Sequence, residues 1–189
     1  GVDPDRVAAR VREERELMGE AQVPGKVVIR PAHTSDVARI RYLVDTYSPD
    51  RRLLSKATVA LYEGVQEFVV AELDGNVVGC GALHVMWEDL AEVRTLAVDP
   101  VVGRRGIGGA LLDELLRRAR TVGVKRVFVL TFEVEFFRRY GFVEIDGTPV
   151  EHDVFEQLLQ SYDEGVAEFL DLERVKPNTL GNSRLLLIL

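Results

Sequence analysis

The stretch from Leu96 to Ala119, LAVDPVVGRRGIGGALLDELLRRA, constrains the fold more than any other part of the sequence. An apolar run of strand length ends at Asp99-Pro100, and a segment rich in glycine and arginine follows. Leucines then recur at the spacing of a helix with one apolar face. The order predicts a strand, a glycine-rich loop and an amphipathic helix. The predicted apolar stripe consists of Leu111, Leu112, Leu115, Leu116 and Ala119.

The loop is predicted to bind an anion. A helix N-terminus exposes N–H groups and the positive end of the helix dipole, and glycines leave those groups accessible to a bulky anion. Its glycines are Gly103, Gly106, Gly108 and Gly109, and its arginines are Arg104 and Arg105. We interpret it as a cradle for a diphosphate, with a plain strand-to-helix connection as the alternative. No Gly-Lys-Ser/Thr follows, and the next strand ends without an acid until Glu133, so neither a P-loop nor a dinucleotide fingerprint is present.

The remaining pattern predicts one mixed α/β domain over residues 26–189. Residues 1–25 are set apart as an N-terminal extension. Glycines at 79 and 81 in a strand indicate a bulge or a close backbone approach. Strands are expected at 26–30, 67–73, 77–87, 90–98, 126–132, 142–146, 167–172 and 184–188, and helices at 34–47, 55–65, 109–120, 134–140 and 151–161.

Composition excludes several classes of function. The net charge of −7 argues against a general nucleic-acid surface, and no apolar run reaches the length of a membrane span. Cys80 is the single cysteine, which excludes an internal disulfide and favours a reducing, cytoplasmic location. The three histidines, His33, His84 and His152, lack the spacing of metal ligands, so no metal site is expected.

Two segments in order, AEVRTLAVDP…GRRGIGGALL and FVLTF…FFRRYGF, resemble the signature motifs of the GCN5-related N-acetyltransferases. The resemblance extends from Val27 to Leu189 and implies the fold of that family, a mixed, mostly antiparallel sheet flanked by helices. It also implies acetyl-CoA as co-substrate, with pyrophosphate on the loop and pantetheine along the preceding strand. The family usually has Gln or Arg at the position of Gly103. Because glycine lacks that side chain, we expect a loop arginine to make its contact with the pyrophosphate. The implied cofactor-binding residues are Leu96, Ala97, Val98, Gly103, Arg104, Arg105, Gly106, Ile107, Gly108, Gly109, Thr131 and Phe137.

The same resemblance implies two catalytic positions. Glu92 aligns with the general base of the family, and Leu96 with the residue whose N–H polarises the thioester carbonyl. Strand alternation places both on one face with Arg94. A glutamate needs a raised pKa to act as a base, and burial would raise it; the alternative is a carboxylate merely paired with Arg94. Phe137 occupies the position at which many relatives have a Tyr that acts as the general acid. Tyr140 is expected to pack in the core.

A closer resemblance is to the short actinobacterial N-acetylglutamate synthases, on VVGCGALHVMWEDLAEVRTLAVDP, FVLTFEVEFFRRYGF and the tail GVAEFLDLERVKPNTLGNSRLLL. It implies acetylation of L-glutamate, or of L-glutamine, as the opening step of arginine biosynthesis, and a homodimer. The alternatives are acetylation of another small amine or of a protein, and an acyl-CoA sensor without turnover. The implied substrate-binding residues are Lys56, Arg94, Asn182, Ser183 and Arg184.

Overall fold

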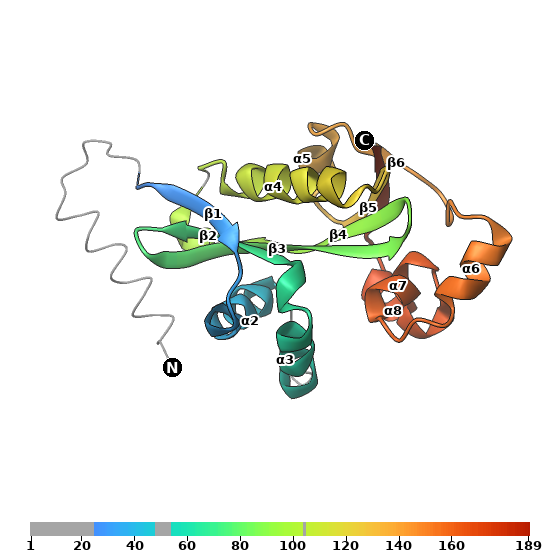
Figure 1. Ribbon diagram of the computed structural model, residues 1–189, viewed down its shortest axis with the longest axis horizontal. Coiled ribbons are helices and arrows are strands. Elements are labelled where there is room, and N and C mark those ends of the chain that lie inside the picture. The colour runs from blue at the N-terminus through green and yellow to red at the C-terminus, as the bar shows by residue number, and fades with distance from the viewer. Residues whose placement is uncertain (1–24, 48–53, 104) are drawn as a thin grey trace. The chain divides into compact units, whose positions relative to one another are not determined.

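The computed structural model describes residues 25–47, 54–103 and 105–189, without the side chains of residues 54–57 and 178. The predictions for the N-terminal extension, for Arg104 and for the side chain of Lys56 therefore lie outside the described residues. Over these residues the strands form a seven-stranded sheet in the order β1-β2-β3-β4-β5-β7-β6. Figure 1 labels the first six of these strands in chain order. Strands β4 and β5 pair in parallel, whereas β1–β2, β2–β3, β5–β7 and β6–β7 pair antiparallel. The predicted mixed, mostly antiparallel sheet is confirmed.

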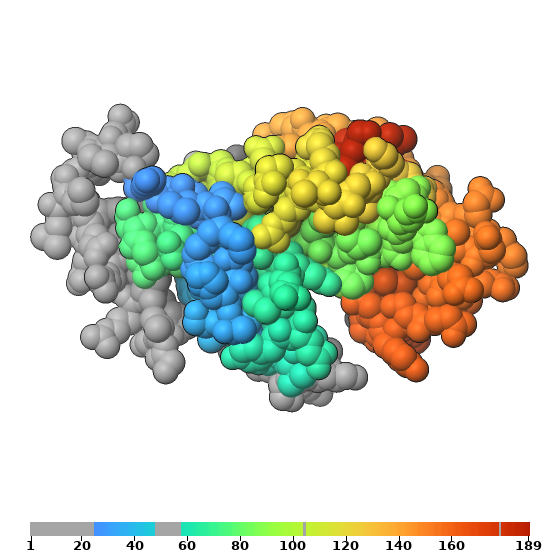
Figure 2. All heavy atoms as spheres, in the orientation of Figure 1, coloured from blue at the N-terminus to red at the C-terminus, as the bar shows by residue number. Residues whose placement is uncertain are grey.

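The described residues divide into two compact units. The first unit comprises the chain up to Ala82 together with Thr95–Leu116. Its helices α2 and α3 lie side by side (Figure 2). Its elements are β1 (Val27–Pro31), η1 (Thr34–Asp36), α2 (Val37–Tyr47), α3 (Leu54–Glu63), η3 (Val65–Glu67), β2 (Phe68–Leu73), η4 (Pro100–Val102) and parts of β3 (Asn76–Trp87), β4 (Leu90–Val98) and α4 (Ile107–Val122).

Helices cover both faces of the sheet in the first unit. A Cβ on Gly79 would lie 3.0 Å from Leu111 Cδ1 of α4, and one on Gly81 would lie 2.9 Å from Leu115 Cδ1. Residues that alternate with these glycines face the other way, where Cys80 packs in a core cluster with Ile40 of α2. The register of β2 on β3 shifts between Ala71 and Glu72, opposite Gly79 and Val77. The predicted bulge and the predicted close approach are therefore both present. The apolar stripe of α4 is buried throughout.

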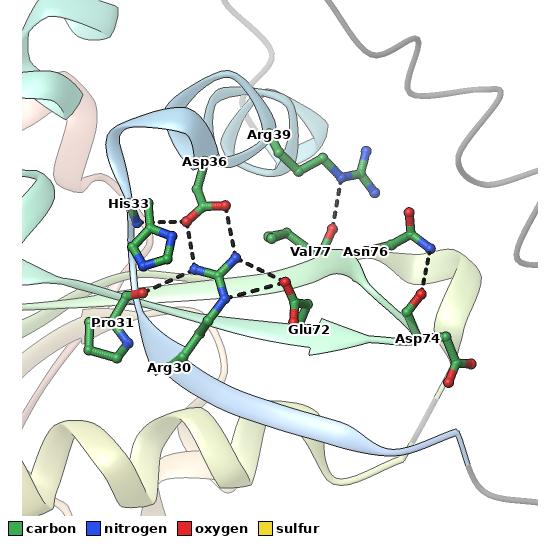
Figure 3. A network of polar contacts seen from close by, with 9 residues as sticks. All are labelled: Arg30, Pro31, His33, Asp36, Arg39, Glu72, Asp74, Asn76 and Val77. Carbon is green, nitrogen blue, oxygen red and sulfur yellow. Dashed lines mark hydrogen bonds and ion pairs between the residues drawn. The ribbon is translucent and has the colours of Figure 1, made fainter.

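An arginine ties the start of α2 to the edge of the sheet (Figure 3). Arg30 donates to both carboxylate oxygens of Asp36, at 2.7 and 3.0 Å, and to Glu72 Oε1 on β2. The backbone N–H of His33 donates to Asp36 as well, at 2.7 Å. The turn that leads from β1 into α2 is thus fixed by a largely buried carboxylate that accepts from both sides of it.

The second unit comprises Leu83–Arg94 and Arg117–Leu189. Strand β5 pairs with β7 from Arg126↔Ile188 to Thr131↔Ser183. The rings of Phe128 and Phe169 meet edge to face at 5.0 Å in its core. Its remaining elements are β5 (Arg126–Thr131), α5 (Val134–Arg138), β6 (Val143–Glu144), α6 (His152–Leu158), α7 (Glu164–Phe169), η5 (Glu173–Val175), α8 (Lys176–Thr179) and β7 (Ser183–Ile188).

One predicted strand is wrong. Residues 167–172 were expected to be extended, but helix α7 occupies Glu164–Phe169. Asp163 caps this helix, because its side chain accepts from the N–H of Val166. Val166, Ala167 and Leu170 are buried, and their spacing is that of one helix face. The closing strand predicted at 184–188 is confirmed as β7.

Candidate active site

The glycine-rich loop of the first unit has the backbone that the anion-cradle hypothesis requires. Gly103 and Gly106 have φ angles of 68° and 73°, which residues other than glycine rarely adopt. A Cβ at either position would meet no atom within 4 Å, so open space lies above both residues. Helix α4 begins at Ile107, which is buried and anchors the first turn, while Arg105 is exposed. The first N–H groups of the helix have no partner within it and are available to an anion.

Buried ion pairing fixes the corner at which β4 leads into this loop. Asp99 is only 3% exposed, caps η4 by accepting from Val101 N at 3.0 Å, and donates its own N–H to Val78 O. Arg39 of α2 donates from Nη2 to Asp99 Oδ2 at 2.7 Å. Its Nε donates to Val77 O at 2.8 Å (Figure 3). Neither Asp99 nor Arg39 was predicted from the sequence. The Asp-Pro pair that closes the strand was the available signal for the cap.

Strand β4 is irregular just before the loop. Thr95 has a φ of 58°, a left-handed conformation that is unusual for a β-branched residue and interrupts even alternation along the strand. Beyond it, the side chain of Leu96 lies beside Gly81, where a Cβ would be 3.0 Å from Leu96 Cδ1. Ala97 is buried in the core cluster, and the carbonyl of Val98 accepts from the hydroxyl of Tyr47. Alternation from Glu92 therefore does not by itself decide where Leu96 points.

Glu92 lies in the second unit and is a buried carboxylate that holds its proton strongly. It is 4% exposed, and Arg94 Nε donates to its Oε1 at 2.9 Å. Burial raises the pKa of Glu92 to about 7; Arg94 opposes this rise, and the negative charges of Glu168 and Asp163 add to it. The predicted pairing with Arg94 is present, but desolvation outweighs it. A carboxyl group that titrates near neutral pH is suited to accept a proton in catalysis.

The guanidinium of Arg94 has a second carboxylate partner. Nη1 and Nη2 donate to Oδ2 and Oδ1 of Asp163, each at 2.9 Å. His84 Nε2 lies 3.9 Å from the same carboxylate. Asp163 was not predicted as a site residue, because the segment after it was expected to be a strand. An Asp followed by Glu164 and apolar residues at helical spacing was the signal for a helix cap.

The predicted substrate residues near the C-terminus lie at the paired ends of β5 and β7. Thr131 pairs with Ser183, and Leu130 with Arg184. The hydroxyl of Thr131 accepts from Glu133 N at 2.9 Å, and Asn182 immediately precedes β7.

The guanidinium of Arg184 donates to three main-chain carbonyls, those of Gly147, Glu168 and Phe169, and lies over the ring of Phe128. Burial lowers the pKa of Arg184, with Asp171 and Glu92 opposing the change, so its charge and that of Glu92 interact. The structure thus brings Glu92, Arg94 and Arg184 into one electrostatic group.

Phe137 belongs to an aromatic cluster. It is 3% exposed, and its ring meets Phe136 at 5.0 Å and Phe142 at 5.3 Å, both edge to face. Tyr140, expected to pack in the core, is half-buried, and its ring lies 5.5 Å from that of Phe136. Within the part of the chain that the structure describes, no three His, Cys, Asp or Glu residues gather as metal ligands. Over the same residues, no helix is long and apolar enough to cross a bilayer.

Comparison with known sequences gives one family. The model of the acetyltransferase (GNAT) family matches residues 37–142. The amino-acid acetyltransferase of Mycobacterium tuberculosis is 62% identical over 165 residues, which are 86% of this chain and 94% of that protein. The amino-acid acetyltransferase of Neisseria meningitidis is 36% identical over 118 residues, which are 61% of this chain but 27% of that longer protein.

Comparison with solved structures agrees. The crystal structure of Rv2747 from Mycobacterium tuberculosis in complex with CoA and NLQ superposes with a TM-score of 0.81 at 62% identity, covering 86% of this chain and 99% of that one. N-acetylglutamate synthase from Neisseria gonorrhoeae, complexed with coenzyme A and N-acetyl-glutamate, gives a TM-score of 0.64 at 25% identity. That match covers 87% of this chain and 35% of the synthase.

Proposed function

This chain belongs to the acetyltransferase (GNAT) family, and from that premise we propose that it is an amino-acid N-acetyltransferase, which moves acetyl from acetyl-CoA to the α-amine of L-glutamate or L-glutamine. The observation that carries the proposal is the 62% identity, over 86% of the chain, with an amino-acid acetyltransferase. Likeness to an N-acetylglutamate synthase solved with coenzyme A and N-acetyl-glutamate favours glutamate as the substrate. The product would enter arginine biosynthesis.

The loop is suited to the diphosphate of acetyl-CoA. Gly103 and Gly106 leave open space where a side chain would stand, and the N-terminus of α4 follows directly. A diphosphate needs several N–H donors together with a positive field, and a helix N-terminus supplies both. Arg105 adds an exposed positive charge beside it. We assign pantetheine to Leu96, Ala97 and Val98 of β4.

The proposed reaction is direct attack of the amine on the thioester. The amine nitrogen bonds to the carbonyl carbon, the carbon–sulfur bond breaks, and the thiolate leaves with the electron pair. Glu92 accepts the amine proton, through a water molecule, and the N–H of Leu96 donates to the carbonyl oxygen as negative charge develops on it. Phe137 has no proton to give, so solvent protonates the thiolate.

Recognition of the amino acid falls to Lys56, Arg94, Asn182, Ser183 and Arg184 in this proposal. Carboxylates are bound best by guanidinium groups and other strong donors. Arg94 and Arg184 already donate to protein acceptors, so each would share its N–H groups with the substrate. The cytoplasmic location and the homodimer stay predictions.

The test is CoA release from acetyl-CoA with glutamate, glutamine and a panel of unrelated amines, against a control without amine. A saturable rate with glutamate or glutamine, with the N-acetylated amino acid identified as product, supports the proposal. Equal rates across the panel favour a broader amine acetyltransferase. Tight CoA binding without any product favours the sensor.

A further inference from the structure

Protein carboxylates hold Arg94 on two edges. Its Nε–H meets Glu92 Oε1, and its Nη1–Nη2 edge meets both oxygens of Asp163, with all three distances at 2.9 Å. A two-point contact fixes both the position and the plane of a guanidinium. The way in which Arg94 approaches Glu92 therefore depends on Asp163.

Asp163 is itself held by the helix that it caps. Its Oδ1 accepts from Val166 N at 2.9 Å, and its own N–H donates to Ser161 Oγ at 3.1 Å. Gly165, in the first turn of α7, lies directly against the guanidinium: a Cβ there would be 2.5 Å from Arg94 Nη2 and 2.6 Å from Cζ. Any larger residue at this position would push Arg94 away from its place.

We infer that Asp163 and Gly165 are positioning residues, which seat the Arg94 guanidinium so that Nε, rather than its two-pronged Nη edge, faces Glu92. The inference rests on the proposed role of Glu92 as the base. A carboxylate gripped by the two-pronged edge of an arginine is held in its ionised form and is a weak base. By occupying that edge, Asp163 leaves Glu92 a single N–H and preserves its affinity for a proton.

Other charged groups also face Glu92. Arg94 faces it from β4, Asp163 from the N-cap of α7, Glu168 from α7 itself, and Arg184 from β7. His84 of β3 stands beside Asp163. Replacing Asp163 by Asn removes one negative charge near Glu92 and releases the Nη edge of Arg94. Both changes favour the ionised form of Glu92.

The variants separate this role from helix capping. Asn caps a helix about as well as Asp, so Asp163→Asn keeps the cap and removes the charge. Glu164→Gln is the matched control, since it removes a charge from the adjacent residue, which is exposed and pairs with Arg174. Gly165→Ala is the second variant: it improves helix propensity but displaces the flexible end of Arg94.

The experiment is a ¹³C NMR titration of the side-chain carboxyl groups in the full chain, with the Glu92 signal assigned by Glu92→Gln. We expect Asp163→Asn to lower the midpoint of Glu92 by about one pH unit, and Glu164→Gln to leave it in place. Gly165→Ala should move the midpoint by about half a unit or more, without loss of melting temperature. A Glu92 midpoint that is the same in wild type, Asp163→Asn and Gly165→Ala would overturn the inference.

Kinetics on the same samples distinguish the positioning of Arg94 from the proposed role of Glu92 as the base. The acid limb of kcat against pH should move with the NMR midpoint in each variant. If the midpoint moves and the rate profile does not follow it, the inference that Asp163 and Gly165 position Arg94 is supported, and the assignment of Glu92 as the base is contradicted. If no amine is acetylated at all, the titration still decides the inference. Should Asp163→Asn fail to fold, Gly165→Ala decides it alone.

Discussion

Arg94 donates a 2.9 Å hydrogen bond to Glu92, and yet Glu92 keeps a pKa of about 7. An adjacent arginine ordinarily lowers the pKa of a carboxyl group, so burial must outweigh the pairing here. Asp163 engages the Nη groups of the same guanidinium, and its negative charge adds to the rise. Glu92 is therefore a buried acid that is only partly neutralised and that changes charge at neutral pH.

The first prediction concerns the pH dependence of acetyl transfer. If Glu92 is the base, it must be ionised, so kcat should fall about tenfold per unit as the pH drops below 7, and should level off above it. Glu92→Gln should lower kcat about 100-fold or more and abolish this limb. CoA release at saturating substrate between pH 5.5 and 9 measures both. Glu88→Gln, in the exposed turn between β3 and β4, should behave as wild type. A wild-type rate that is flat from pH 5.5 to 7 would contradict the assignment.

The second prediction concerns stability. In the unfolded chain Glu92 loses its proton near pH 4.3, whereas in the folded chain it keeps it to about pH 7. Between these values unfolding releases a proton, so this group makes wild type progressively less stable as the pH rises through the window. Glu92→Gln lacks the effect. Its free energy of unfolding relative to wild type should therefore increase by about 3 kcal/mol between pH 4.5 and pH 8.

Urea unfolding of both proteins at the two pH values measures this difference. Glu164→Gln is the control, and its free energy of unfolding relative to wild type should not change between the two pH values. A difference between Glu92→Gln and wild type that does not change with pH would show that Glu92 has an ordinary pKa. Such a result would also remove the physical basis for the base assignment.

The third prediction tests the loop. Gly106→Ala places a methyl group in the open space above the loop and strains a backbone with a φ of 73°. Gly75→Ala, in the β2–β3 turn, carries the same kind of strain at a φ of 80°, also with open space around it. Each should cost about 1–2 kcal/mol of stability. Only Gly106→Ala should also raise the KM for acetyl-CoA, by about tenfold. Equal KM values in the two variants would count against the cradle.

Local pattern predicted the strand–loop–helix unit well, because glycine and leucine spacing depend on neighbours in sequence. It failed at α7, where apolar residues in a short segment fit a strand as well as a helix, and only the cap at Asp163 distinguishes the two. Alternation placed Glu92 beside Arg94, as found. It could not foresee Thr95, whose left-handed backbone runs against the propensity of a β-branched residue.

The link between Arg94 and Asp163 was beyond any local pattern. The two residues lie 69 positions apart and meet only because α7 packs within the same unit as residues 90–94 of β4. The pKa of Glu92 could not be predicted from the sequence either, because a sequence shows which residue can ionise but not how far the fold removes it from water. Sequence identity with known proteins identifies the family. The burial and contacts of Glu92 explain why it is suited to accept a proton.

The last prediction concerns Arg184, for which the sequence resemblance implied a substrate contact. In the structure its guanidinium donates to the carbonyls of Gly147, Glu168 and Phe169, and thereby ties the end of α7 to β7. An ammonium group cannot reach all three carbonyls, so Arg184→Lys would leave the part-buried carbonyls of Glu168 or Phe169 without a donor. We expect a loss of about 2 kcal/mol and a melting temperature lower by about 4–8 °C, together with a raised KM for the amino acid, since the proposed contact with the substrate carboxylate would be weakened as well.

Arg174→Lys, at an exposed ion pair, is the control that should leave both quantities unchanged. A different result for Arg184→Lys, a wild-type melting temperature with a KM for the amino acid raised about tenfold, would assign the guanidinium to the substrate carboxylate alone. Thermal unfolding and steady-state kinetics on one preparation therefore decide between the structural role and the recognition role. A fall in stability accompanied by a raised KM would mean that Arg184 serves both, with its N–H groups shared between the protein carbonyls and the substrate.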